Sequence, residues 1–280
     1  MRFSVTVVPT DRGALLTDIA RAVEERGLDG LWLPDHTHVP TSRRTPMPLH
    51  GEVPDRYLRN LEPLTCLALA AAVTSRIRLG TGVLLAAQRD PIVTAKALAT
   101  IDDQSGGRLA LGVGYGWSVE EMADHGVDPG TRWARTREHV LAMRRLWEDD
   151  VASYAGRFVS FGPCWSWPKP VQQPLPVFIG GAPTTKVFDH IAEFGAGWLP
   201  VGGRHLGDNV RRLRDHVAAA GRDPATLEVI PFTAGELSPA KVDALHAAGA
   251  TEIAVDIAPD WSAAQTALDR IAAFAAVQAR

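Results

Sequence analysis

The chain has 280 residues, of which 46% are hydrophobic and 22% are charged, and its formal net charge at pH 7 is -3. This composition is ordinary for a globular protein with a large core. The two cysteines, Cys66 and Cys164, are too few for a disulfide framework, and the small net charge favours neither a nucleic-acid nor a membrane partner.

The first half of the chain alternates strand patterns with helix patterns, judged by the period of its apolar residues. A strand pattern stands at the very start with no signal peptide before it, and no apolar run is long enough to span a membrane, so we expect a cytoplasmic protein. The expected elements are a strand at 2–8, a helix at 13–26, a strand at 30–34, an irregular proline-rich loop at 36–61, a helix at 64–74, a strand at 77–85, a helix at 91–105 and a strand at 109–113.

The second half continues the same alternation after a glycine-rich loop region at 114–130. The expected elements are a helical turn at 119–123, a helix at 132–148, a β-pair at 157–161, a strand at 177–180, a helix at 186–194, a strand at 197–201, a helix at 206–220, a strand at 227–232, a helix at 239–247, a strand at 252–257 and a helix at 262–277.

Eight strands, each followed by a helix, predict one α/β domain over residues 1–280. Eight such units favour a closed (β/α)8 barrel, the TIM barrel, over an open sheet. Long insertions follow strands 2 and 4, and a third precedes strand 5. In such barrels the catalytic residues lie at the carboxyl ends of the strands, so the residues that end each strand are the candidates.

Asp35 and His36 follow strand 2 and form the first candidate site, because a histidine with a pKa near neutrality can donate or accept a proton. The alternative interpretation is a capping aspartate beside a hydrogen-bonded histidine. Tryptophans near strand ends and insertion loops could line a pocket for a flat ligand or close the rim of the barrel. These are Trp32, Trp117, Trp165, Trp167 and Trp198.

The turn after strand 5, from Gly180 to Lys186, is the second candidate site. Glycines at the start of a helix let backbone N–H groups approach an anion, and two threonine hydroxyls and a lysine add to a phosphate site. The alternative interpretation is a tight turn that needs glycine for its backbone angles.

His36 and His38 also allow a different class of protein, a metal-dependent hydrolase on the same fold. That class requires further imidazole ligands at other strand ends. Here only Asp256, near the end of strand 8, is in place. We therefore expect no catalytic metal.

Three stretches carry a family resemblance: LWLPDH, LGTGVLLAAQRDPIVTAKALATIDDQSGGRLALGVGYGW and PVFIGGAPTTKVFDHIAEFGAGWLPV. Over residues 1 to 205 the chain resembles the luciferase-like monooxygenase family, and most of all its branch that depends on the deazaflavin coenzyme F420. The resemblance implies hydride transfer between F420 and a small organic substrate. The alternatives are an FMN monooxygenase that uses reduced flavin and O2, and a flavin-binding protein without catalytic activity.

The resemblance also assigns roles to residues. His36 and Asp35 match the pair beside the deazaflavin ring, with His36 as proton donor or acceptor. Gly82 and Val83 match a non-prolyl cis peptide that backs the ring. The loop along the cofactor's side chain corresponds to Gly114, Tyr115 and Gly116, and the phosphate turn to Gly180, Gly181, Ala182 and Thr184.

The chain departs from the family pattern at the second proton-transfer group. Many deazaflavin enzymes of this fold carry a glutamate soon after the strand-4 glycines, where Trp117 and Ser118 stand here, with Glu120 and Glu121 further on. Arg108 resembles a structural residue at the turn before strand 4. The family often forms dimers through helices 2 and 3, so we expect a homodimer.

Overall fold

The computed structural model describes residues 1–48, 51–201 and 205–278. Its main sheet has nine strands in the order β10-β11-β1-β2-β3-β4-β7-β8-β9, and all paired neighbours run parallel. The strands are β1 (Arg2–Val7), β2 (Gly30–Leu33), β3 (Arg78–Thr81), β4 (Leu109–Val113), β7 (Val177–Gly181), β8 (Gly197–Pro200), β9 (Glu228–Val229), β10 (Phe232–Thr233) and β11 (Glu252–Ile257).

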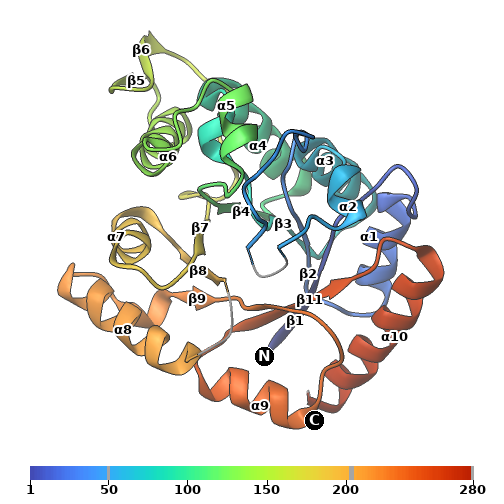
Figure 1. Cartoon of the computed structure of the whole chain (residues 1–280). Coiled ribbons are helices and arrows are strands. Elements are labelled where there is room, and N and C mark those ends of the chain that lie inside the picture. The colour runs from blue at the N-terminus through green and yellow to red at the C-terminus, as the bar shows by residue number, and fades with distance from the viewer. Residues whose placement is uncertain (49–50, 202–204, 279–280) are drawn as a thin grey trace.

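The helices lie around the outside of this sheet (Figure 1). They are α1 (Leu16–Glu25), α2 (Asp55–Leu58), α3 (Pro63–Val73), α4 (Pro91–Ser105), α5 (Val119–Asp124), α6 (Arg132–Glu148), α7 (Thr185–Phe194), α8 (Leu206–Ala219), α9 (Pro239–Ala247) and α10 (Trp261–Gln278), with short 3-10 turns at Ala86–Gln88 and Pro224–Thr226. None of the helices in the described ranges is long and apolar enough to cross a membrane.

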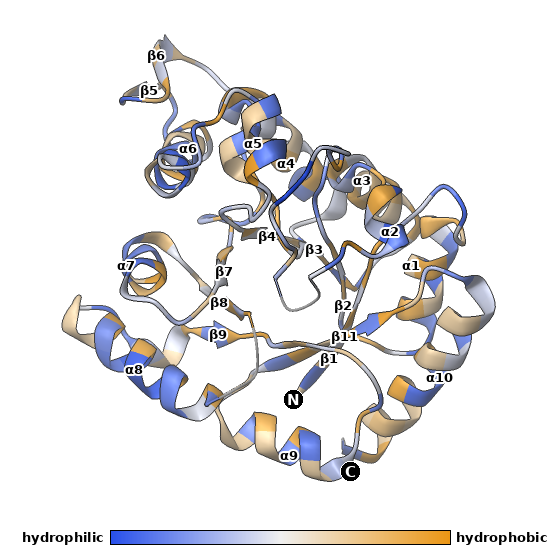
Figure 2. Cartoon of the chain, in the orientation of Figure 1, coloured by the Kyte–Doolittle hydropathy of each residue, from blue (hydrophilic) through white to orange (hydrophobic). Residues whose placement is uncertain are grey.

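The strands β9 and β10 lie at opposite edges of the sheet, yet only two residues of the chain separate them. The sheet must therefore curl until its two edges come close together. Apolar side chains therefore form two layers. A small inner cluster includes Trp32, Phe178 and Ile230, and a large outer cluster fills the space between the sheet and the helices. Figure 2 shows the corresponding pattern on several helices, among them α8 and α10, where hydrophobic and hydrophilic residues alternate around the axis.

Local sequence signals explain where the helices begin and end. Asp90 accepts hydrogen bonds from the backbone N–H groups of Ile92 and Val93, both at 2.9 Å, and Pro91 occupies the first turn of α4. Gly106, with a φ of 70°, ends that helix in the left-handed conformation.

The observed order of elements confirms the alternation of strands and helices, and most predicted boundaries differ from the observed ones by only a few residues.

Two predicted strands are wrong in extent. The strand expected at 77–85 ends at Thr81, and Leu84 makes only an isolated bridge to Val113. The strand expected at 227–232 consists of two pieces, β9 and β10. Pro231 lies between them and has no N–H to donate, so it interrupts the ladder.

The segments between the main strands also differ from the prediction. The irregular loop expected at 36–61 contains the short helix α2. The β-pair expected at 157–161 is a hairpin of β5 (Ala152–Ala155) and β6 (Ser160–Cys164), which projects from the edge of the molecule beside α6 (Figure 1).

Arg108 has the structural role that the sequence suggested. Its guanidinium donates to the carbonyl oxygens of Ala71, Thr74 and Ile77 at 2.9–3.1 Å, and its Nε donates to Ser105 at 2.8 Å. These bonds join the ends of α3 and α4 below the start of β4.

Candidate active site

His36 lies directly beyond β2 and is held by residues that follow β4. Its Nδ1 is 2.8 Å from Oε2 of Glu121, and its Nε2 accepts a hydrogen bond of 3.2 Å from the indole N–H of Trp117. His36 is 8% exposed and Glu121 is 1% exposed. These contacts fix the imidazole as the tautomer that donates from Nδ1 and accepts at Nε2.

Sequence analysis named Glu121 only as a glutamate beyond Trp117 and Ser118 and gave it no role. Ser118 and Glu121 have the spacing of a helix capping box. Half of that box is present: the Ser118 hydroxyl accepts from the Glu121 N–H at 3.3 Å and starts α5. The Glu121 carboxylate, however, binds His36 and the backbone N–H of Thr37, both in the segment after β2. The spacing is visible in the sequence, but the long-range partner is not.

Asp35 lies next to His36 and is engaged in a structural ion pair. Arg89 donates to both of its carboxylate oxygens, at 2.9 and 2.7 Å, and the N–H of Leu85 donates to Oδ2 at 2.9 Å. Arg89 also pairs with Glu62 at 2.9 Å. Burial alone would lower the pKa of Arg89, but the hydrogen bond and charge of Asp35 raise it. The Asp35 carboxylate thus positions the end of β2 against the segment after β3.

Helix α2 lies over the mouth of the sheet and is tied to it by arginines. Arg56 forms a bidentate pair with Asp256 at the end of β11, at 2.7 and 3.2 Å, and Arg59 pairs with Asp11 at 2.9 Å. Tyr57 lies against His36, with ring centroids 5.9 Å apart. His36 therefore has an aromatic ring on two sides, Tyr57 and Trp117.

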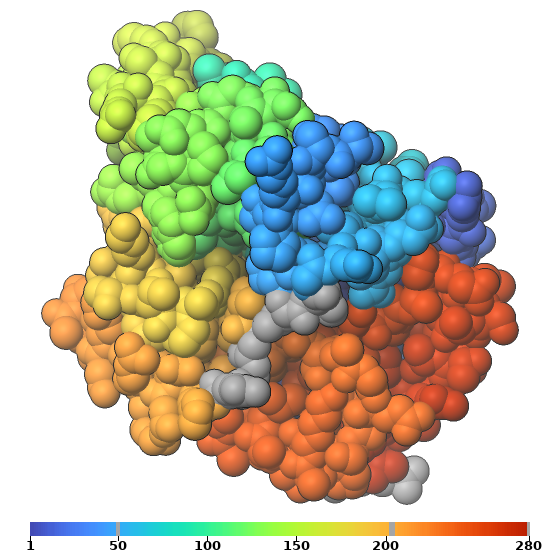
Figure 3. All heavy atoms as spheres, in the orientation of Figure 1, coloured from blue at the N-terminus to red at the C-terminus, as the bar shows by residue number. Residues whose placement is uncertain are grey.

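The segments after β2 and β4 meet over this site. The backbone N–H groups of Arg44 and Thr45 donate to Glu120 at 2.8 and 3.1 Å. These hydrogen bonds lower the pKa of Glu120 to about 2. In Figure 3 the blue atoms of the first segment and the green atoms of the second form one continuous surface.

The peptide bond between Gly82 and Val83 is cis, as the family resemblance implies. The Val83 side chain lies between two of the predicted cofactor glycines: a Cβ on Gly114 would come within 2.3 Å of it, and one on Gly180 within 2.6 Å. Real Cβ atoms essentially never approach so closely, so both positions require glycine as long as valine stands at position 83. The geometry thus gives Gly114 and Gly180 a packing role, whatever they bind.

Tyr115 and Gly116 continue the loop after β4. Tyr115 is 7% exposed, stacks on Trp133 with centroids 3.6 Å apart, and its hydroxyl lies 2.7 Å from Nδ1 of His190. Burial raises the pKa of Tyr115 and lowers that of His190. Gly116 has a φ of 73°, which favours glycine. Tyr115 therefore anchors the loop rather than projecting from it.

The turn after β7 is open to solvent and stands at the start of α7. Ala182, Thr184 and Lys186 are exposed, and the Thr184 hydroxyl accepts from the Val187 N–H at 3.4 Å. A Cβ on Gly181 would come within 2.9 Å of Val187, so the turn is tight as well as exposed. A helix N-terminus, a hydroxyl and an ammonium group together suit an anion.

The five tryptophans noted in the sequence have different environments. Trp32 and Trp198 are buried, and only Trp117 touches His36. Trp165 and Trp167 are 78% and 58% exposed, in the segment after β6.

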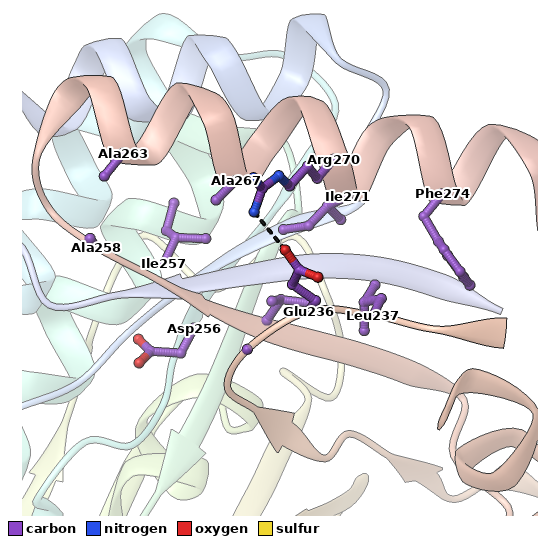
Figure 4. A pocket seen from close by; sticks show the side chains of 12 residues that line it. Glu236, Leu237, Asp256, Ile257, Ala258, Ala263, Ala267, Arg270, Ile271 and Phe274 are labelled. Atoms are coloured by element: carbon purple, nitrogen blue, oxygen red, sulfur yellow. Dashed lines mark hydrogen bonds and ion pairs between the residues drawn. The ribbon is translucent and has the colours of Figure 1, made fainter. Parts of the chain in front are cut away.

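A separate cavity of about 520 Å³ lies between β11, α10 and residues 235–237. Figure 4 shows Ile257 pointing toward α10, Asp256 pointing the other way, and the pair between Glu236 and Arg270, 2.7 Å long, crossing the space. Because it lies on the helix side of the sheet, this cavity is distinct from the mouth where His36 stands.

A family model described as luciferase-like monooxygenase matches residues 3–248. The chain belongs to the luciferase-like monooxygenase family. The resemblance seen in the sequence is thereby confirmed, and the metal-dependent hydrolase is no longer a candidate.

Relatives within the family carry different names. An uncharacterised protein of Mycobacterium tuberculosis is 41% identical over 283 residues, which cover 98% of both chains. An F420-dependent glucose-6-phosphate dehydrogenase of Kineococcus radiotolerans is 30% identical over 76% of this chain and 61% of that enzyme. A pyrimidine monooxygenase, RutA, of Allorhizobium ampelinum is 31% identical over 77% of this chain and 60% of that enzyme.

Solved structures agree on the fold. The monooxygenase RslO1 of Streptomyces bottropensis superposes with a TM-score of 0.84 at 21% identity, over 100% of both chains. The F420-dependent tetrahydromethanopterin reductase of Methanopyrus kandleri gives 0.74 at 19% identity, over 97% of both chains. The curled parallel sheet is therefore that of the luciferase-like family.

Proposed function

We propose that this protein is an F420-dependent oxidoreductase that transfers a hydride between the deazaflavin and a small organic substrate. The observation that supports this most is the hydrogen bond between Nδ1 of His36 and Glu121, which leaves Nε2 as a proton acceptor at the mouth of the sheet. The relative named as an F420-dependent dehydrogenase supports the choice of cofactor.

F420, when bound, supplies a ring carbon that gives or takes a hydride. The chain's own residues supply proton transfer and orientation. Nε2 of His36 exchanges a proton with the substrate, and the Trp117 N–H is the partner that the substrate replaces. Glu121 stabilises the positive charge that His36 gains. Asp35 acts as a positioning residue through Arg89 and Leu85.

The residues present fit a phosphate-bearing cofactor. The turn of Gly180, Gly181, Ala182 and Thr184 offers an exposed helix N-terminus to the phosphate, and Lys186 adds a positive charge. Gly82 and Val83, beside Gly114, would back the ring, while Tyr115 and Gly116 would follow the side chain. Tyr57 and Trp117 would exclude water from His36.

The second candidate function is an FMN-dependent monooxygenase that uses reduced flavin and O2. The relative named as pyrimidine monooxygenase RutA favours it, and the same phosphate turn would serve FMN. The two functions differ in the cofactor that binds and in the need for oxygen.

We also propose that residues 1–280 form one (β/α)8 domain, with β9 and β10 as two halves of a single strand. The support is that β9 pairs with β8 while β10 pairs with β11. Two such chains would form a homodimer through α3 and α4, where Leu69 is 51% and Val93 is 68% exposed.

The test is a fluorescence titration of the purified protein with oxidised F420 and, separately, with FMN. Saturable binding of F420 alone supports hydride transfer, and binding of FMN alone supports the monooxygenase. If neither binds, the proposed function is wrong. The Gly181→Asp variant is the control, because a carboxylate in the turn would repel a cofactor phosphate.

A further inference from the structure

Three side chains that could bind a metal ion lie together at the mouth of the sheet. His38 follows β2, Glu121 belongs to α5, and His125 ends α5. Each offers one ligand atom, and the three atoms lie within 4.8 Å of one another. Two imidazole nitrogens and one carboxylate oxygen are a donor set that suits zinc, cobalt or nickel better than magnesium or calcium.

Hydrogen bonds already orient both imidazoles toward one point. Nδ1 of His38 and Nε2 of His125 lie 2.9 and 2.7 Å from the same atom, the Thr37 hydroxyl oxygen. The other nitrogen of His38, Nε2, lies 3.0 Å from a carboxylate oxygen of Asp124. An imidazole that binds a metal commonly gives its second N–H to a carboxylate, which fixes the tautomer and directs the free lone pair at the ion.

Glu121 supplies the fixed part of the cluster. It is 1% exposed, with Oε2 on His36 and Oε1 on the Thr37 N–H, 3.2 Å away. A carboxylate oxygen has two lone pairs, so Oε1 keeps one for a metal. The side chain of His38 is 42% exposed, so a small shift that keeps its bond to Asp124 can bring the ligands to metal-bond distances of about 2.0–2.2 Å.

We propose that His38, Glu121 and His125 bind one divalent transition-metal ion of the zinc class. His38 comes from the segment after β2, whereas Glu121 and His125 come from the segment after β4. The ion therefore joins the two segments that cover His36. Because it binds only the folded chain, it raises the stability of the fold.

The experiment uses the full chain without an affinity tag, freed of metal with a chelator. Co²⁺ is added while its visible absorption is followed, and Zn²⁺ is then added to displace it. We expect one equivalent to bind. The variants His38→Ala and His125→Ala should each bind at least tenfold more weakly. The matched control is His246→Ala, an exposed histidine on α9 outside the cluster, which should bind like the wild type.

A third variant keeps all three ligands. Asp124→Asn should weaken binding by about 10-fold, the lower end of the range for residues that orient a ligand. Zn²⁺ should also raise the melting temperature of the wild type and of His246→Ala, and that of His125→Ala by less at the same Zn²⁺ concentration. The proposal is overturned if the wild type shows no saturable binding, or if His38→Ala and His125→Ala, folded by circular dichroism, bind as well as the wild type. Neither measurement involves the redox cofactor.

Discussion

At the scale of single residues, the site is organised by His36 and its two partners. Glu121 and Trp117 occupy opposite nitrogens of the ring, so the imidazole has one orientation and one tautomer. Asp35 pairs with Arg89, which supports the positioning role that we propose for it. The sequence left the second proton-transfer group open, and Glu121, hydrogen-bonded to Nδ1 of His36, is the carboxylate that we propose supports it.

We expect His36→Ala to bind the cofactor with unchanged affinity but to turn over about 100-fold or more slowly, the range for the loss of a general acid–base group. Cofactor affinity is measured by fluorescence titration and turnover in the steady state. Unchanged turnover would remove His36 from the mechanism.

Glu121→Gln keeps the shape of the side chain and removes its charge. We expect a lower kcat with little change in KM, because the charge matters once His36 is protonated. In the double variant with His36→Ala, the loss should be no greater than in His36→Ala alone, since the two residues act as one unit. An additive loss would show that Glu121 acts independently of His36.

In Gly181→Asp a carboxylate would enter the turn before α7. We expect weaker cofactor binding, by about tenfold or more, since like charges at close range cost on the order of 1 kcal/mol or more even in water. Gly181→Asn is the matched control without the charge. Equal affinities for the two variants would place the phosphate elsewhere.

At the scale of elements, the sequence predicted what local signals control. Helix α4 starts at Asp90 and Pro91 and ends at Gly106, and each of these residues acts within one turn of the helix. The sequence prediction missed two strand breaks, one after Thr81 and one at residues 230–231. The first precedes Val83, which packs against Gly114 and Gly180, far away in the chain. The second was readable, because Pro231 stands inside the apolar run.

The contact between the β4 loop and α7 has a pH-dependent part. Burial lowers the pKa of His190 below its usual 6.5, although the charge of Glu193 opposes the shift. As the pH falls below about 6.5, the unfolded chain binds a proton that the folded chain does not, so stability is lost toward the lower folded pKa. We expect His190→Gln to lose less unfolding free energy than the wild type between about pH 7.5 and pH 5.5 in urea titrations. An equal loss would contradict this.

At the scale of the whole molecule, the order of strands and helices could be predicted because each unit has its own apolar period. The contacts of the segments that cover the mouth of the sheet could not be predicted, because they join residues far apart in the chain. Arg56 reaches Asp256, and His38 reaches Asp124, through side chains whose partners lie 86 to 200 residues away.

The proposed dimer can be tested at its apolar surface. Leu69→Glu combined with Val93→Glu should shift the protein from dimer to monomer in sedimentation velocity, because charges would be buried between α3 and α4 of two chains. Val277→Glu is the matched control, a 70% exposed valine on α10. A wild-type monomer, or a variant that remains a dimer, would contradict the proposal.

The contact of Val83 with Gly114 and Gly180 has a consequence for evolution. The three residues lie at or just beyond the ends of β3, β4 and β7 and pack together there, so we expect the three positions to form a single epistatic unit. A larger residue at 114 or 180 becomes acceptable only after position 83 has become smaller. Among relatives, we therefore expect side-chain size at these positions to covary inversely, and Gly114→Ala to be better tolerated in a Val83→Ala background than alone.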